Sequence, residues 1–161
     1  MSPGGAASGR KGARYERELV NALREAGWGA LRLPSSGSAT ERELPDILAG
    51  TPEAVAGPDG ERALSSLWAV EAKCGNSSTL YVDGDEVTAL IEYAQRWGAR
   101  PLLGARYTTR DMGKFHYLVL PGDARITDGG NYGLPKDDLH ERAWAVVSPD
   151  DGTAFLKEHI A

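Results

Sequence analysis

Two ionisable side chains end an otherwise apolar stretch, residues 67–73 (LWAVEAK), which is typical of a buried strand. They are Glu71 and Lys73, and residues two apart in a strand share one face, so a carboxylate lies beside an ammonium. The opposite face then holds the apolar members of the stretch, Trp68, Val70 and Ala72. Further upstream, Asp46 opens a second short apolar strand, 46–49.

Carboxylates at strand ends suit Mg²⁺, which prefers oxygen and is usually held by one or two carboxylates with waters and substrate phosphate. We expect Asp46 and Glu71 to be ligands, and the backbone carbonyl of Ala72 to add a third. Mg²⁺, or Mn²⁺ as a substitute, supports phosphodiester hydrolysis by activating water and stabilising charge. Lys73 would orient or deprotonate the water, or stabilise charge on the phosphate. A solvated ion pair between Glu71 and Lys73 is the alternative.

A helix is expected before this site, over residues 12–27. Its apolar residues recur at intervals of three and four, and Gly27 favours its end: Ala13, Leu19, Val20, Leu23 and Ala26. Glu16 lies on the same stripe. It either occupies the margin of the stripe, where negative charge suits the start of a helix, or joins the metal centre directly or through a water molecule.

A strand is predicted at 28–33, with Arg32 near its end and Pro34 after it. The loop that follows contains Ser35, Ser36 and Ser38. Hydroxyl and backbone N–H groups in such a loop can bind phosphates, and Arg32 would add charge. An ordinary flexible connection is an equal alternative.

The remaining elements follow from periodicity and turn residues. Residues 50–66 form a hairpin-type excursion, 80–82 a short extended piece, and 85–97 a helix with Asp83 or Asp85 as cap and Gly98 at its end. Strands are expected at 101–107, 114–120 and 143–147, a loop at 122–134, and a C-terminal helix at 152–159 capped by Asp150 or Asp151. This order predicts an α/β fold with a central mixed β-sheet flanked by helices.

Length and composition indicate one domain, residues 10–161, after a flexible tail at 1–9. No apolar run approaches a membrane span and no secretory signal begins the chain, so we expect a cytoplasmic protein with no membrane partner. The net charge of −5 is unusual for a nucleic-acid-binding protein. Because the chain is acidic and has five Lys against thirteen Arg, it resembles proteins of a halophile, in which acidic surfaces serve solvation.

Several residues are expected to be structural. Cys74 has no evident acid–base partner, and the three histidines lack metal-ligand spacing. The four tryptophans are expected in the core: Trp28, Trp68, Trp97 and Trp144.

The Pro45-Asp46 pair followed by Glu71-Ala72-Lys73 resembles the motif of the PD-(D/E)xK nucleases, which have a restriction-endonuclease-like fold. A longer series of segments, over residues 10–120, resembles the archaeal Holliday junction resolvases, the Hjc family. The matching segments are 10–13 (RKGA), 16–19 (EREL), 46–50 (DILAG), 70–73 (VEAK), 80–82 (LYV), 90–94 (LIEYA) and 101–103 (PLL). Residues 122–161 match that family poorly.

The resemblance implies a homodimer that binds four-way junction DNA and makes paired symmetric nicks in homologous recombination and repair. It assigns catalytic roles to Glu16, Asp46, Glu71 and Lys73. It assigns phosphate contacts to Arg17 and Arg32, and places Arg10 and Lys11 near the junction. Exposed apolar residues on the strand at 115–120 or on the second helix are candidates for the dimer surface. Two alternatives remain: another repair or restriction-type nuclease of this fold, and a non-catalytic junction-binding protein.

Overall fold

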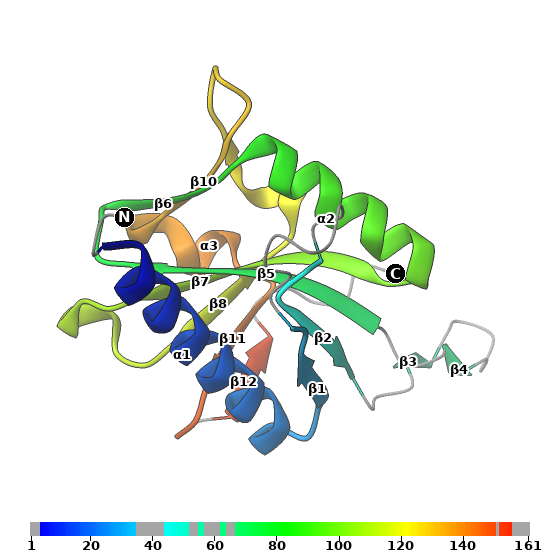
Figure 1. Ribbon diagram of the computed structural model, residues 1–161. Coiled ribbons are helices and arrows are strands. Elements are labelled where there is room, and N and C mark those ends of the chain that lie inside the picture. Colours follow the sequence, from blue (N-terminus) through cyan, green and yellow to red (C-terminus); the bar gives the residue numbers. More distant parts are fainter. Residues whose placement is uncertain are drawn as a thin grey trace.

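The computed structural model describes residues 4–34, 44–51, 55–56, 62–63, 67–150 and 152–155 (Figure 1). Its helices are α1 (Gly4–Glu25), α2 (Gly84–Trp97) and α3 (Leu139–Arg142). Its strands are β1 (Gly29–Arg32), β2 (Ile47–Gly50), β3 (Val55–Ala56), β4 (Arg62–Ala63), β5 (Leu67–Gly75), β6 (Thr79–Val82), β7 (Arg100–Tyr107), β8 (His116–Val119), β9 (Arg125–Ile126), β10 (Tyr132–Pro135), β11 (Ala145–Ser148) and β12 (Gly152–Phe155).

A seven-stranded sheet organises the molecule, in the order β1-β2-β5-β7-β8-β11-β12. Only β5 and β7 pair in parallel, whereas every other neighbouring pair is antiparallel. Parallel neighbours need a crossover connection, and α2 lies in the segment that supplies it. The predicted α/β fold with a central mixed sheet flanked by helices is therefore confirmed.

Each of the two long helices covers one face of this sheet, as Figure 1 shows. The core under α1 contains Leu19 and Leu23 of the helix and Trp68 and Val70 of β5, with Ala72 packed against it. The core under α2 contains Ala69 of β5 and three residues of the helix, Val87, Leu90 and Ala94. The alternation of side chains along β5 thus assigns neighbouring residues to different cores, as predicted for residues 68–72.

The ends of both helices follow from local chemistry. Gly27, at a φ of 88°, reverses the chain after α1, and the N–H of Trp28 bonds to the carbonyl of Leu23 at 2.9 Å. Asp83 caps α2 by accepting a 2.9 Å hydrogen bond from the N–H of Asp85, and Gly98 ends it at a φ of 64°. Asp83, one of two predicted caps, is thus the N-cap.

The structure corrects the N-terminal boundary. Helix α1 begins at Gly4, so residues 4–9 are helical where a tail was predicted. Residues 1–3 lie outside the described part of the chain. No described helix is long and apolar enough to cross a membrane, and that includes the 22-residue α1.

The predicted C-terminal helix is wrong over residues 152–155, whereas the other predicted cap, Asp151, and residues 156–159 lie outside the described part of the chain. Residues 152–155 form β12, which pairs antiparallel with β11 in the register Ser148↔Gly152. Asp150 lies in the turn between them, where its N–H bonds to the Ser148 hydroxyl, so it caps no helix. Gly152 supplies the positive φ of 72° that begins the returning strand.

The region predicted as a loop, 122–134, also contains regular structure. Strands β9 and β10 form a hairpin that joins β6 in a second, three-stranded sheet. In Figure 1 the tip of this hairpin projects beyond the start of α2. The excursion at 50–66 contains the antiparallel pair β3–β4, as its hairpin-type prediction requires.

Candidate metal centre

The carboxylate of Asp46 is fixed at the edge of β5. Asp46 lies directly before β2, and its own N–H bonds to the carbonyl of Val70 at 3.0 Å. Its Oδ2 accepts a 2.8 Å hydrogen bond from the N–H of Ala72. The side chain therefore continues the hydrogen bonding of the sheet beyond the start of β2, and its partner, Ala72, is the residue next to Glu71.

Glu71 and Lys73 lie on the face of β5 that α2 covers. Lys73 Nζ is 3.6 Å from Glu71 Oε1, so the predicted juxtaposition of the two side chains is confirmed. Both side chains are mostly buried, at 15% and 28% exposure. An ion pair that two residues make on a solvated surface would be far more exposed, which argues against the simplest alternative for this pair.

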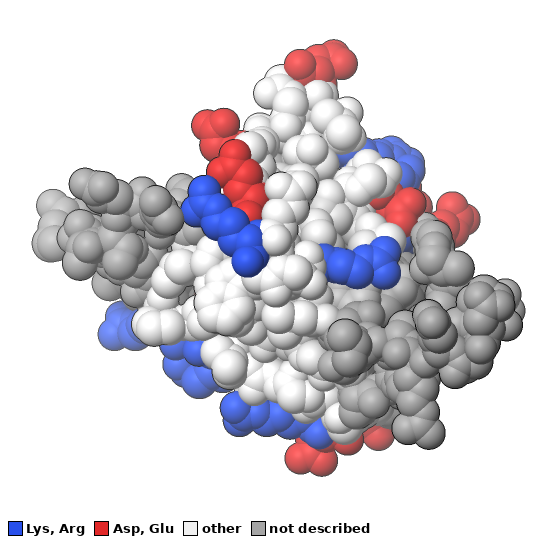
Figure 2. All heavy atoms as spheres, turned by 90° about the vertical axis from the view of Figure 1, so that its right-hand side faces the viewer, with Lys and Arg blue, Asp and Glu red and all other residues white. Residues whose placement is uncertain are grey.

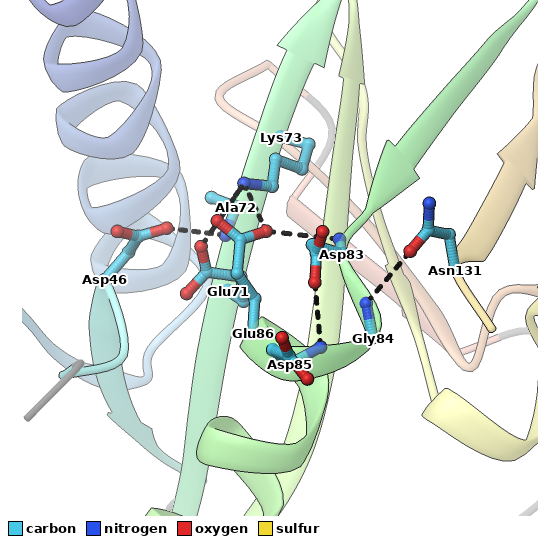
Figure 3. A network of polar contacts seen from close by, with 9 residues as sticks. All are labelled: Asp46, Glu71, Ala72, Lys73, Asp83, Gly84, Asp85, Glu86 and Asn131. Carbon is cyan, nitrogen blue, oxygen red and sulfur yellow. Dashed lines mark hydrogen bonds and ion pairs between the residues drawn. The ribbon is translucent and has the colours of Figure 1, made fainter. Parts of the chain in front are cut away.

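A third charged residue, Glu86, was not anticipated. Its carboxylate contacts Lys73 Nζ at 3.0 and 3.1 Å, and it also accepts a 3.2 Å hydrogen bond from the N–H of Asp83 (Figure 3). The sequence does contain a signal for this side chain, since Asp83 and Glu86 have the spacing of a capping box. The spacing predicts the cap, but it does not predict that the same glutamate reaches Lys73.

Burial and mutual repulsion perturb the two proposed ligands. Burial raises the pKa of Asp46 to about 6, helped by the charges of Glu16 and Glu86 and opposed by the Ala72 N–H and Lys73. Burial also raises the pKa of Glu71 to about 8, with Asp46 and Glu86 adding to the effect. The site thus disfavours simultaneous ionisation of its carboxyl groups, and a bound divalent cation would stabilise their ionised forms.

Lys73 experiences opposing effects. Burial alone would lower the pKa of its ammonium, but Glu86 and Glu71 outweigh burial and raise it. Lys73 is therefore held as a cation between Glu86 and Glu71.

Glu16 approaches from the other face of the sheet. Its direct partner is Arg32, whose Nε lies 2.6 Å from Glu16 Oε2, and both side chains are largely buried. Glu16 lines a small cavity under α1 together with Ala72 and Cys74. It is close enough to Asp46 to raise the pKa of that carboxyl group, but its carboxylate is engaged by Arg32.

The oxygen atoms of Asp46, Glu71 and Ala72 fit a metal ion that takes only some of its ligands from the protein. Among the described residues, no three His, Cys, Asp or Glu side chains are grouped closely enough to bind a metal alone. Mg²⁺ needs no more than one or two carboxylates, with waters and substrate completing its shell. The N–H and carbonyl of one residue leave a strand on the same edge, so the Ala72 carbonyl lies on the edge that faces Asp46.

The residues predicted to contact DNA fall into three groups. Arg10, Lys11 and Arg17 are exposed along α1. Arg32 is largely buried in its pair with Glu16. The three loop serines, Ser35, Ser36 and Ser38, lie outside the described residues.

Two residues expected to be structural have perturbed pKa values for structural reasons. Burial raises the pKa of the Cys74 thiol, which keeps it protonated and unreactive. Burial, with the nearby charge of Arg106, lowers the pKa of His116 to about 3. Neither residue has the environment of a catalytic group.

The candidate dimer surfaces are not equivalent. Strand β8 lies between β7 and β11, and all four of its residues are buried, so it offers no exposed apolar surface. On α2, Trp97 is 57% exposed and its ring stacks on that of Tyr93 at 6.0 Å. The expectation that all four tryptophans belong to the core is therefore wrong for Trp97.

The fold and this arrangement define the class of protein. A mixed sheet flanked by helices, with an aspartate before one strand and Glu-x-Lys on its neighbour, is the restriction-endonuclease-like fold carrying a PD-(D/E)xK motif. The model of the archaeal Holliday junction resolvase family, Hjc, matches residues 7–134, and the chain belongs to that family. The match extends beyond the 10–120 span of the sequence resemblance.

Individual relatives agree with this assignment. Crossover junction endodeoxyribonuclease Hjc of Sulfurisphaera tokodaii is 26% identical over 134 residues, which are 81% of this chain and 80% of the relative. The protein of that name from Archaeoglobus fulgidus is 36% identical over 89 residues, 55% of this chain and 56% of the relative. The solved structure of Archaeoglobus fulgidus Hjc, a Holliday junction resolvase, matches with a TM-score of 0.65 at 23% identity, covering 82% of this chain and 94% of that one. The structural match confirms the predicted fold.

Proposed function

We propose that this chain is a Mg²⁺-dependent endonuclease that resolves four-way DNA junctions by paired symmetric nicks. The observation that carries the proposal is the position of Asp46, whose carboxylate is held at the Ala72 N–H beside Glu71 and Lys73. The names of the relatives supply the substrate, because each is called a crossover junction endodeoxyribonuclease.

In this proposal Asp46, Glu71 and the Ala72 carbonyl hold the metal ion, which supplies an activated water and charge stabilisation when bound. Lys73 orients the attacking water and adds positive charge beside the phosphate, since its ammonium lies against Glu71. Glu16 holds Arg32 in place beside the site, and a water molecule would connect it to the metal.

The DNA backbone would follow the exposed basic residues of α1. Arg10, Lys11 and Arg17 are available for phosphate contacts, because each is exposed on the helix. Arg32 would offer the guanidinium nitrogens that Glu16 does not engage. The serine loop after β1 would complete the phosphate contacts.

We also propose that the protein acts as a homodimer through the end of α2. Trp97 is exposed there, and an open groove nearby is lined largely by apolar residues: Ile91, Ala99, Arg100, Pro101, Leu120, Pro121, Gly122 and Asp123. Figure 2 shows the face on which α2 ends, with a mostly uncharged central area bordered by charges of both signs. Two-fold symmetry would present a second centre to the opposite strand.

A cleavage panel tests the proposed function. The protein is incubated with Mg²⁺ and end-labelled four-way junction, flap, nicked duplex and linear duplex at equal concentration. We expect paired symmetric nicks in the junction and little cutting of linear duplex. Preference for linear duplex would favour a restriction-type nuclease, and junction binding without cleavage in Mg²⁺ or Mn²⁺ would favour a non-catalytic protein.

A further inference from the structure

Lys73 lies between two carboxylates, and the nearer one is outside the sequence motif. The Lys73 ammonium is 3.0 and 3.1 Å from the two oxygens of Glu86, compared with 3.6 Å from Glu71. In Figure 3 the two glutamates approach the ammonium from different elements, β5 and α2. Glu86 therefore makes the closer contacts with the end of this flexible side chain.

We propose that Glu86 is a positioning residue for the reaction: it holds the Lys73 ammonium beside the metal ligands. This inference rests on the proposed function, in which Lys73 acts on the attacking water or the phosphate. Lys73 is 28% exposed, so without Glu86 its ammonium could turn toward solvent. A lysine has four rotatable side-chain bonds and many alternative rotamers, which makes such a restraint valuable.

Glu86 is itself restrained. It is the third residue of α2, and its carboxylate accepts the Asp83 N–H within the capping box. The helix behind it is anchored by the buried side chains of Val87, Leu90 and Ala94. Through Glu86, the Lys73 ammonium is thus attached to a helix whose own position is set by buried side chains.

The β9–β10 hairpin fixes the start of the same helix. The N–H of Gly84 donates a 3.2 Å hydrogen bond to Oδ1 of Asn131 in that hairpin. A Cβ atom at Gly84 would lie only 2.5 Å from the carbonyl oxygen of Gly130, so the hairpin packs directly against the helix. Figure 3 shows this chain of contacts from Asn131 through the helix start to Lys73.

The test compares Glu86→Gln with Glu92→Gln. Glutamine retains an oxygen that can accept the Asp83 N–H, but it removes the charge that attracts Lys73. Glu92 is an exposed glutamate on the same helix and controls for the loss of one negative charge. We expect Glu86→Gln to slow single-turnover cleavage of prebound junction about 10- to 100-fold, the range that a misplaced catalytic group produces. Glu92→Gln should match the wild type.

Three further measurements separate positioning from other roles. Junction affinity in Ca²⁺ and the melting temperature should be nearly unchanged by Glu86→Gln, because a packed α2 does not depend on this charge. The Mg²⁺ concentration for half-maximal rate should also be unchanged, and a large increase would make Glu86 a metal ligand, which overturns the proposal. Glu86→Asp, which keeps the charge on a shorter side chain, should recover part of the rate.

The dependence on Lys73 is tested by a double variant. Glu86→Gln should cause no additional loss of rate in a Lys73→Ala background, because its effect requires the ammonium. Losses that multiply would show that Glu86 acts independently of Lys73 and would overturn the inference.

A spectroscopic measurement does not depend on cleavage. The protein has five lysines, so ¹⁵N spectra of lysine ammonium groups are simple, and Lys73→Arg identifies the signal. We expect a protected Lys73 ammonium signal in the wild type that broadens or disappears in Glu86→Gln and persists in Glu92→Gln. An unchanged signal in Glu86→Gln would refute the contact even if junctions are cut. If the signal is lost in Glu86→Gln but the wild type cleaves no junction, the contact between Glu86 and Lys73 is supported and the proposed function is refuted.

Discussion

The N–H of Ala72 donates a 2.8 Å hydrogen bond to Oδ2 of Asp46, so a side chain takes the place that a backbone carbonyl of β2 would occupy beside β5. This bond determines the orientation of the Asp46 carboxylate before any metal binds. One Asp46 oxygen meets the N–H, which leaves the other available to a cation on the side of Glu71. The strand pairing and the geometry of the metal centre are therefore parts of one structural feature.

Replacement of Asp46 by asparagine should abolish most cleavage while preserving the fold. The amide oxygen of asparagine can still accept the Ala72 N–H, but the charge that binds the metal is lost. Removing groups that only support metal ligands already costs about 10- to 100-fold, so we expect a loss of more than about 100-fold. Rates should be measured in Mg²⁺ and junction affinity in Ca²⁺. Asp128→Asn, at an exposed position, is the control, and wild-type cleavage by Asp46→Asn would remove Asp46 from the centre.

His116 should make the protein sensitive to acid. Its pKa is about 3 in the folded protein against an ordinary 6.5, so between these pH values the unfolded chain binds a proton that the folded chain does not. Stability is therefore lost as pH falls, at up to about 1.4 kcal/mol per pH unit. Compared with His116→Gln, the wild type should lose about 2 kcal/mol more between pH 7 and pH 5.

Urea unfolding at pH 7, 6 and 5 measures this difference. The groups around His116 include Arg106, Glu16, Lys73 and Cys74, all of which line the same cavity and are present in both proteins. The raised pKa values of Asp46 and Glu71 act in the opposite direction, but they are also shared, so the comparison removes them to first order. Parallel pH profiles for the two proteins would contradict the prediction.

Two glycines in helices should respond to alanine in opposite ways. Alanine at Gly84 would place its Cβ 2.5 Å from the Gly130 carbonyl oxygen, and displacing that backbone should cost about 1–3 kcal/mol. At Gly12 of α1 a Cβ would meet no atom within 4 Å, so alanine should stabilise the protein by about 0.5–1 kcal/mol. Denaturant unfolding of both variants checks the signs. A stabilised Gly84→Ala would show that the hairpin does not press on α2.

Trp97→Ser should weaken self-association without weakening the protomer. The side chain is 57% exposed, so its loss removes little of the core, and the unfolding free energy of the protomer should change by less than about 0.5 kcal/mol. Sedimentation over a range of concentrations should show a shift toward the monomer. Tyr81→Ser, at an equally exposed residue of β6, is the matched control and should sediment like the wild type.

The sequence predicted those parts of the site that depend on one strand or on one short connection. Glu71 and Lys73 share a face because residues alternate along β5, and Asp46 precedes a strand that pairs with it. Glu86 was missed because its contact with Lys73 depends on how α2 packs over the sheet, which no local pattern contains. The pairing of Arg32 with Glu16 was missed for a similar reason, since it joins residues of a helix and a strand.

The fold was predictable where periodicity was strong, as in α1, α2 and β5. The prediction of the fold failed at residues 152–155, where four residues form a strand because they pair with the edge of β11. The prediction also failed at Trp97. This residue has the spacing of the apolar face of α2, but the last residue of the helix in the core is Ala94. The conformation of short segments, and the burial of residues at the end of an apolar helix face, depend on tertiary contacts that local sequence does not contain.

The lysine and the two glutamates that contact it come from one uninterrupted stretch, from β5 through β6 to the first turn of α2. Asp46 is contributed across the pairing of β2 with β5, and α1, β7 and β8 supply other residues of the cavity that Lys73 lines. A chain built in this way can lengthen or shorten the β3–β4 excursion between its two halves without moving the lysine relative to its glutamates. The pairing of β2 with β5, and not the length of the segment that joins the two strands, therefore keeps Asp46 beside the lysine and its glutamates.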